Sequence, residues 1–137
     1  MDDSTSGLEE KYRVGQRDLQ QRLLEYGVRI IKLVESLPNT LTGRRIADQL
    51  LRSGTSVGAN YEEARGAESR QDFAHKLQIA LKELRESNYW LRLISGAQLL
   101  PRDRLAAIID ESNQLRALLS KAVATTKGTA KQEPKKP

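Results

Sequence analysis

The amino-acid sequence predicts an all-α protein: an antiparallel up-down-up-down four-helix bundle with a disordered basic C-terminal tail. Three observations support this prediction. Apolar residues recur at three- and four-residue spacing in four segments, which is the period of an amphipathic helix. Turns that contain proline, glycine or capping residues separate these segments. No segment shows the alternating apolar and polar pattern that is typical of a strand.

The first helix is expected to run from Val14 or Arg17 to Leu37, and Pro38-Asn39 ends it. Its apolar stripe consists of Leu19, Leu23, Tyr26 or Gly27, Ile30, Val34 and Leu37. Because these residues share one face, we expect this face to lie against the other helices.

The second helix is expected to begin near Thr42, whose hydroxyl would cap the first turn, and to fade at residues 65–66. Ser69 is the next candidate N-cap, with Asp72 three residues later as a weak capping box. The stripe of the second helix is Ile46, Leu50, Ser53, Val57, Asn60 and Tyr61.

The third helix is predicted over residues 70–95 and the fourth over residues 102–124, with Gly96 and Pro101 bracketing the turn between them. The stripe of the third helix is Phe73, Leu77, Ala80, Leu81, Leu84, Asn88, Leu91 and Ile94. The stripe of the fourth is Leu105, Ile108, Ile109, Ser112, Leu115, Leu118, Leu119 and Ala122.

The chain has 137 residues, enough for one domain. We divide it into a flexible N-terminus at 1–14, the bundle at 15–125 and a disordered basic tail at 126–137. There is no cysteine, and His75 is the single histidine, expected to be exposed. Disulfides, thiolate nucleophiles and histidine-rich metal sites are therefore excluded. We expect a protein that is not an enzyme and that uses no metal and no cofactor.

The net charge of +5 favours an acidic partner such as nucleic acid. Arg44, Arg45, Arg52 and the basic tail are the candidate contacts. Arg44 and Arg45 lie near a helix N-terminus, which also favours phosphate. The alternative is that these arginines are ordinary solvated surface. The sequence shows neither a signal peptide nor an apolar run of about 20 residues, so we expect a cytoplasmic protein without a membrane partner.

The third helix carries a second apolar patch at Ile79, Trp90 and Leu93, turned away from its main stripe. A bundle buries one stripe per helix, and tryptophan is favoured where two proteins meet. We therefore predict an interface between subunits at these residues. The alternative is a wide stripe that flanks a neighbouring helix.

Small residues are concentrated in the segment 51–67, LRSGTSVGANYEEARGA. A phosphate-binding loop would need a lysine after its second glycine and a preceding strand, and both are missing. Gly54 and Gly58 instead share a helical face, where small residues let backbones approach and hydroxyls bond back to carbonyls. We therefore expect a close-packing surface inside a helix.

Polar residues around this segment are interpreted as a network that fixes helix register: Arg52, Asn60, Glu63 and Glu86. Paired carboxylates such as Glu62/Glu63 or Glu83/Glu86 are the residue types that acid–base or metal chemistry uses, which leaves an active site as the alternative reading. A diiron bundle, however, needs Glu-x-x-His motifs, and His75 has no glutamate at that spacing.

The same residues resemble the signature of the four helix bundle protein family, which includes the proteins encoded in intervening sequences of bacterial large-subunit ribosomal RNA genes. The first part of the motif is matched by Arg52, Ser53, Ser56, Val57, Asn60 and Glu63. The second part is matched by Asp72, Phe73, Leu77, Ala80 and Glu86. Ala64 departs from the usual glycine, and alanine suits a helix better.

The resemblance implies a four-helix bundle that forms a ring, typically a homopentamer. The accessory variability proteins of diversity-generating retroelements are similar in fold, and they are basic pentamers that contact RNA and a reverse transcriptase. We therefore expect a ring-forming scaffold that associates with RNA, or with a nucleoprotein component such as a reverse transcriptase. The alternative is a pure protein–protein interaction module that binds no nucleic acid.

Overall fold

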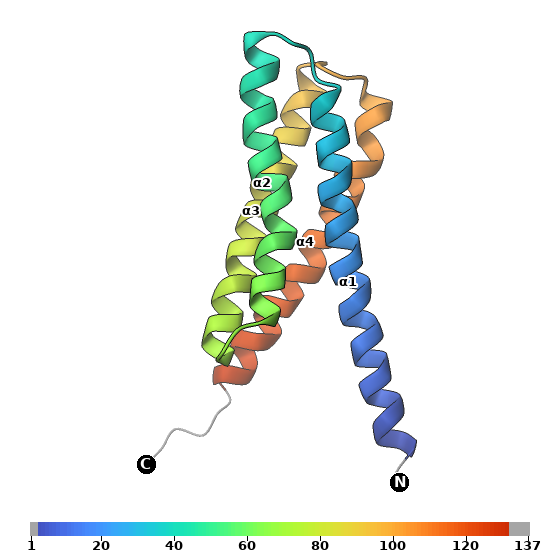
Figure 1. The fold of residues 1–137 in the computed structure, drawn as a ribbon, viewed down its shortest axis with the longest axis vertical. Coiled ribbons are helices and arrows are strands. Elements are labelled where there is room, and N and C mark those ends of the chain that lie inside the picture. The colour runs from blue at the N-terminus through green and yellow to red at the C-terminus, as the bar shows by residue number, and fades with distance from the viewer. Residues whose placement is uncertain (1–2, 132–137) are drawn as a thin grey trace.

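The computed structural model describes the backbone of residues 3–131 and the side chains of residues 18–128. The described backbone forms four helices: α1 (Asp3–Glu35), α2 (Leu41–Arg65), α3 (Arg70–Gly96) and α4 (Arg102–Lys131). They alternate in direction, and each packs against two neighbours in the cyclic order α1, α2, α3, α4 (Figure 1). The predicted all-α bundle is confirmed.

The described helices extend beyond residues 15–125 at both outer ends of the bundle. Helical backbone covers residues 3–14 and 126–131, where the sequence predicts flexible ends. Neither α1 nor α4 contains a proline, and each residue added to an existing helix gains a backbone hydrogen bond. The rest of the predicted N-terminal segment and tail, residues 1–2 and 132–137, lies outside the described residues.

The predicted caps are correct at α3 and wrong at α2. The hydroxyl of Ser69 accepts a hydrogen bond from the backbone N–H of Asp72 at 3.0 Å, as expected. At α2 the cap is Thr40, whose hydroxyl accepts from the N–H of Gly43 at 3.0 Å, while Thr42 lies inside the first turn. Thr40 has the extended backbone that an N-cap requires, so the cap lies two residues earlier than predicted and the helix begins at Leu41.

The core consists mainly of leucine, isoleucine and valine from all four helices. The buried residues of the predicted stripes include Leu23, Tyr26, Ile30, Leu50, Val57, Tyr61, Leu77, Leu84, Leu91, Ile94, Leu105, Ile108, Leu115 and Leu119. Leu118 is an exception, since its side chain is 39% exposed. Within residues 18–128 every buried side-chain nitrogen or oxygen has a hydrogen-bond partner, so the core is fully satisfied.

No described helix is both long enough and apolar enough to cross a membrane.

Candidate functional site

Two residues of the predicted polar network, Arg52 and Glu86, interact at the seam between α2 and α3. The guanidinium of Arg52 donates to Glu83 at 3.1 Å and also pairs with Glu86. The indole N–H of Trp90 donates to the same Glu86 carboxylate at 3.0 Å. Arg52 is therefore held by two carboxylates from the next helix, which fixes the register between α2 and α3.

The other two members of the predicted network have separate partners. Glu63 accepts a hydrogen bond from Lys76 of α3 at 3.1 Å. The amide of Asn60 donates to the carbonyl of Ser56 within α2 at 2.8 Å. The four residues therefore lie along one helix seam without forming a single connected cluster.

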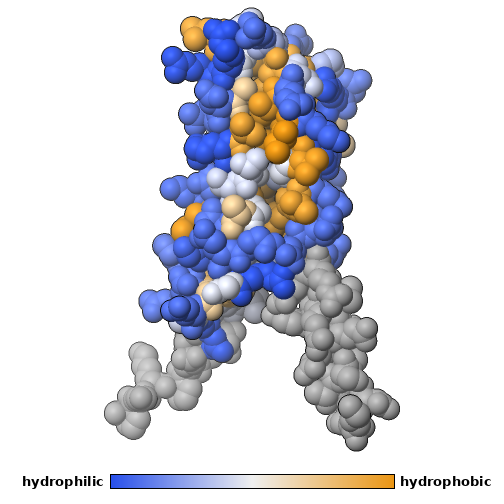
Figure 2. All heavy atoms as spheres, in the orientation of Figure 1, coloured by the Kyte–Doolittle hydropathy of each residue, from blue (hydrophilic) through white to orange (hydrophobic). Residues whose placement is uncertain are grey.

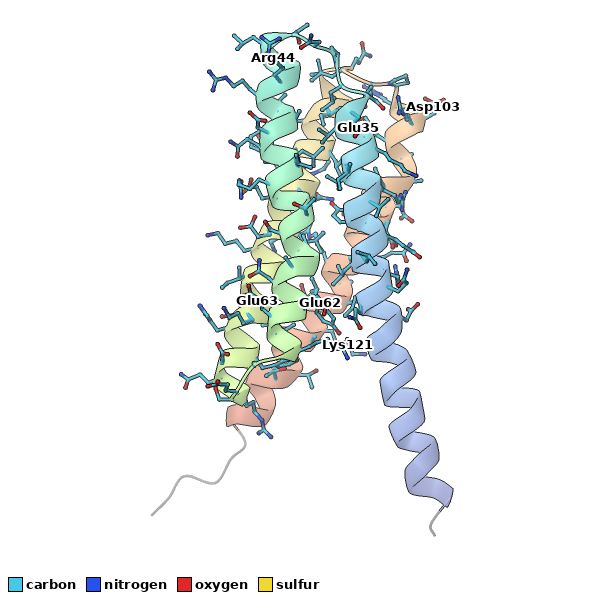
Figure 3. The ribbon with its side chains drawn as sticks, viewed as in Figure 1. Glu35, Arg44, Glu62, Glu63, Asp103 and Lys121 are labelled. Carbon is cyan, nitrogen blue, oxygen red and sulfur yellow. The ribbon has the colours of Figure 1, made fainter. Side chains whose placement is uncertain are left out.

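The neighbouring carboxylates of Glu62 and Glu63 lie on opposite flanks of α2 (Figure 3). Glu62 accepts a hydrogen bond from Gln20 of α1 at 2.5 Å, whereas Glu63 pairs with Lys76 of α3. Because the two side chains diverge, they do not form the converging carboxylate pair that acid–base chemistry uses. Among residues 18–128 no three His, Cys, Asp or Glu side chains lie close enough together to hold a metal ion.

The segment of small residues lies inside α2 and packs against α1, as predicted. A Cβ atom added to Gly54 would lie 2.8 Å from two carbons of Ile30, while one added to Gly58 would lie 3.5 Å from the carbonyl oxygen of Leu23. The hydroxyls of Ser53 and Thr55 donate to carbonyls one turn earlier, at 2.8 and 2.6 Å. The segment is a packing surface, and a phosphate-loop interpretation is wrong.

The predicted apolar patch on α3 is only partly exposed. Ile79 and Trp90 are half-buried, and Trp90 packs against the edge of the core. Leu93 is 37% exposed and Tyr89, whose ring stands edge-on to that of Trp90, is 49% exposed. The interface prediction at Ile79, Trp90 and Leu93 stays a prediction, with Leu93 as its accessible part.

A larger apolar surface, which the sequence reasoning missed, covers the seam of α1 and α2. Leu24, Val28 and Ile31 of α1 are 61%, 44% and 42% exposed. They border a hollow of about 330 Å³ whose α2 side is formed by Thr55, Gly58, Ala59 and Glu62. Figure 2 shows orange residues gathered along this face. The signal in the sequence is a second set of apolar residues at spacings of four and three on the first helix.

The three candidate nucleic-acid contacts are in different environments. Arg44 and Arg45 are exposed at the start of α2, whose first turn contains no acidic residue. Figure 3 shows Arg44 at this end of the bundle. Arg44 donates to the side-chain oxygen of Asn39 at 3.0 Å. The charge of Arg52 is matched by Glu83 and Glu86, so Arg52 is less suited to a phosphate contact than the other two.

Two titratable groups of α1, the buried Tyr26 and the partly exposed Arg22, are stabilised in the states they have at neutral pH. Burial raises the pKa of Tyr26 to about 12, so its phenol is protonated. The hydrogen bond from Arg22 of α1 to Glu111 of α4 raises the pKa of the Arg22 guanidinium. The Nη2 atom of Arg22 lies 2.6 Å from Oε1 of Glu111. Both groups connect helices, and neither lines the hollow between α1 and α2.

The bundle with this α2–α3 motif matches a known family: residues 16–121 fit the 23S rRNA-intervening sequence protein family. The chain belongs to this family. It is also similar to a protein of unknown function from the S23 ribosomal protein family of Bacteroides thetaiotaomicron, whose crystal structure was determined at 1.70 Å resolution. The two sequences are 40% identical, and the match covers 77% of this chain and 97% of that one, with a TM-score of 0.72.

No curated protein matches the chain. The similar protein from Bacteroides thetaiotaomicron is itself of unknown function.

Proposed function

We propose that this protein is a non-enzymatic scaffold that self-associates, as a ring, and that associates with RNA or a nucleoprotein. The observation that carries the proposal is the apolar surface on α1 and α2, where Leu24, Val28 and Ile31 are exposed side by side. Contiguous apolar surface of this kind is characteristic of sites where proteins bind one another.

A ring is supported by the presence of a second exposed apolar site on another helix. Leu93 lies on α3, whereas Leu24 and Val28 lie on α1, and α1 and α3 are not neighbours in the described bundle. Contacts between two different surfaces of the same chain are head-to-tail, and such contacts close into rings when the rotation permits. A homopentamer is the assembly that the family resemblance implies.

Light scattering on the purified full chain tests self-association. We expect the mass of a pentamer of 15.4 kDa chains, and a lower mass for Leu24→Gln combined with Val28→Gln. Leu41→Gln is the matched control, because Leu41 is 64% exposed at the start of α2, away from the hollow. A monomeric mass for the unchanged protein contradicts the proposal.

Association with RNA is supported by the net charge of +5, because a basic protein attracts the phosphate backbone. Binding of a structured RNA should weaken steeply as salt concentration rises, because each phosphate contact releases counterions. Absence of binding at low salt contradicts this part of the proposal. Capture of protein partners from cell extract that survives nuclease treatment, without any RNA binding, supports the alternative of a pure protein-interaction module.

A further inference from the structure

The groove between α3 and α4 is lined by basic and neutral residues only. One hollow of about 460 Å³ is bordered by Lys82 and Arg85 of α3 and by Lys127 of α4. A second hollow of about 530 Å³ continues it toward the start of α3 and is bordered by Arg70 and His75. The two hollows share Gln78 and Lys127, so they form one groove. No aspartate or glutamate is among the described residues that line it.

Three basic side chains of this groove have no ion-pair partner among the described residues. Lys82, Arg85 and Lys127 form no ion pair with any residue in the range 18–128, whereas Arg52 and Lys76, at the α2–α3 seam, are both paired with glutamates. Lys82 and Arg85 are three residues apart on one helix, so they are neighbours that repel each other. A bound polyanion would relieve that repulsion.

Beyond the groove, toward the other end of α3, polar side chains join α3 to α4. The Nε of Arg92 donates to Asn88 at 2.9 Å, and the amide of Asn88 donates to Ser112 and Asn113 of α4 at 2.6 and 3.1 Å. The α3 residues that line the groove run from Arg70 to Arg85, about 23 Å along the helix axis at 1.5 Å per residue. This length accommodates several nucleotides of a nucleic-acid strand.

The shape of the groove favours a strand over a lipid surface. Its apolar lining residues Leu81 and Val123 are buried, whereas surface attachment to a bilayer requires exposed apolar side chains beside the basic ones. A concave track of Lys and Arg with neutral hydrogen-bonding residues such as Gln78 and Ser120 is the arrangement that follows a phosphate backbone.

We propose that the α3–α4 groove binds the phosphate backbone of RNA through Lys82, Arg85 and Lys127. The inference rests on the proposed association with RNA and assigns it to a surface other than Arg44 and Arg45. The contact is independent of base sequence, because its charged groups pair with phosphates, and contacts to phosphates carry no sequence information.

The test is binding of a fluorescently labelled RNA hairpin to the full chain across a salt series. Lys82→Gln combined with Arg85→Gln is compared with Arg44→Gln combined with Arg45→Gln, since each pair removes two exposed charges from one helix. We expect the groove pair to raise Kd by about tenfold or more at low salt and to reduce the salt slope by about two. The Arg44/Arg45 pair should stay within about twofold of the unchanged protein.

Equal losses of RNA affinity in the two double variants would show that only net charge matters. A loss of affinity confined to the Arg44/Arg45 variant would place the RNA site at those two residues. Either result overturns the groove assignment and leaves the RNA association standing. If the unchanged protein binds no RNA at low salt, both the groove assignment and the association with RNA fail. Binding of an acidic protein or of anionic lipid vesicles would not rescue either of them. Thermal unfolding of both variants, followed by circular dichroism, checks that a loss does not come from unfolding.

Discussion

The hydroxyl oxygens of Tyr26 on α1 and Ser87 on α3 lie 2.7 Å apart in the buried centre of the bundle. The Ser87 hydroxyl also lies 2.9 Å from the carbonyl oxygen of Leu84, which can only accept. Ser87 has a single proton to donate, so it donates to Leu84 and the phenol of Tyr26 donates to Ser87. This direction connects two diagonal helices through a chain of two hydrogen bonds.

The direction of these bonds predicts unequal costs for removing the two hydroxyls. Tyr26→Phe leaves Ser87 bonded to Leu84 and should lower the free energy of unfolding by about 1 kcal/mol. Ser87→Ala leaves the buried phenol of Tyr26 without its acceptor and should cost about 2–3 kcal/mol. Chemical denaturation of both variants measures the difference. Equal costs would contradict the assigned direction.

The raised pKa of Tyr26 predicts a specific loss of stability at alkaline pH. The phenol titrates near 10.0 in the unfolded chain and at about 12 in the folded one. Between these values the unfolded state binds fewer protons than the folded state. The contribution of the protonated Tyr26 phenol to stability is therefore complete below pH 10.0 and is lost as pH rises through about 12. The loss amounts to about 2–3 kcal/mol. The Tyr26→Phe variant should not show this loss of stability. Chemical denaturation of the variant and of the unchanged protein between pH 10 and about 12 compares the two.

Alanine substitutions at Gly54 and Gly58 should change the stability of the protein in opposite directions. The new methyl at Gly54 would press on the branched side chain of Ile30, so Gly54→Ala should destabilise the protein by about 1–3 kcal/mol. At Gly58 the added carbon would be in ordinary van der Waals contact, so the better helix propensity of alanine should stabilise by up to about 1 kcal/mol. Thermal unfolding of the two variants measures both. A tolerated Gly54→Ala would mean that α1 and α2 are not closely packed there.

The turn after α3 contains a position that favours glycine. Gln98 has a φ of 57°, and the N–H groups of Gln98 and Leu99 donate to Ser95 and Ile94 at 3.1 and 3.0 Å. This pairing is the Schellman motif, whose left-handed residue is usually glycine. Gln98→Gly should raise the free energy of unfolding by up to about 1 kcal/mol, because the left-handed strain exceeds the added flexibility of the unfolded chain. Ala97→Gly, at φ −83°, is the control and should destabilise.

The sequence predicts the bundle well because its main information is the spacing of apolar residues. That spacing correctly identifies four helices and most of the core, including Leu77, Leu84 and Leu91. The cap at α2 was misplaced because Thr40 and Thr42 are equivalent as residue types, and the choice between them depends on the backbone after Pro38. Local chemistry therefore locates a helix end only to within a few residues.

The candidate surfaces were harder to predict for a geometrical reason. A search for one stripe per helix assigns Leu23 and Ile30 to the core and leaves Leu24, Val28 and Ile31 unexplained, although these three form a stripe of their own. The basic groove is not a local pattern at all. It requires knowing that the end of α4 lies beside the start of α3, which brings Lys127 to Lys82 across 45 residues of chain.

The cyclic order of the helices places the α1–α2 seam and the α3–α4 seam on opposite sides of the bundle. A contact at Leu24 and Val28 of one copy therefore lies on the side of the bundle opposite the Lys82–Arg85 groove of the same copy. Each added copy would then carry one more weak phosphate site on the same particle. Weak sites linked in this way act at high effective concentration, and avidity rather than the affinity of a single groove would set how long a polyanion stays bound.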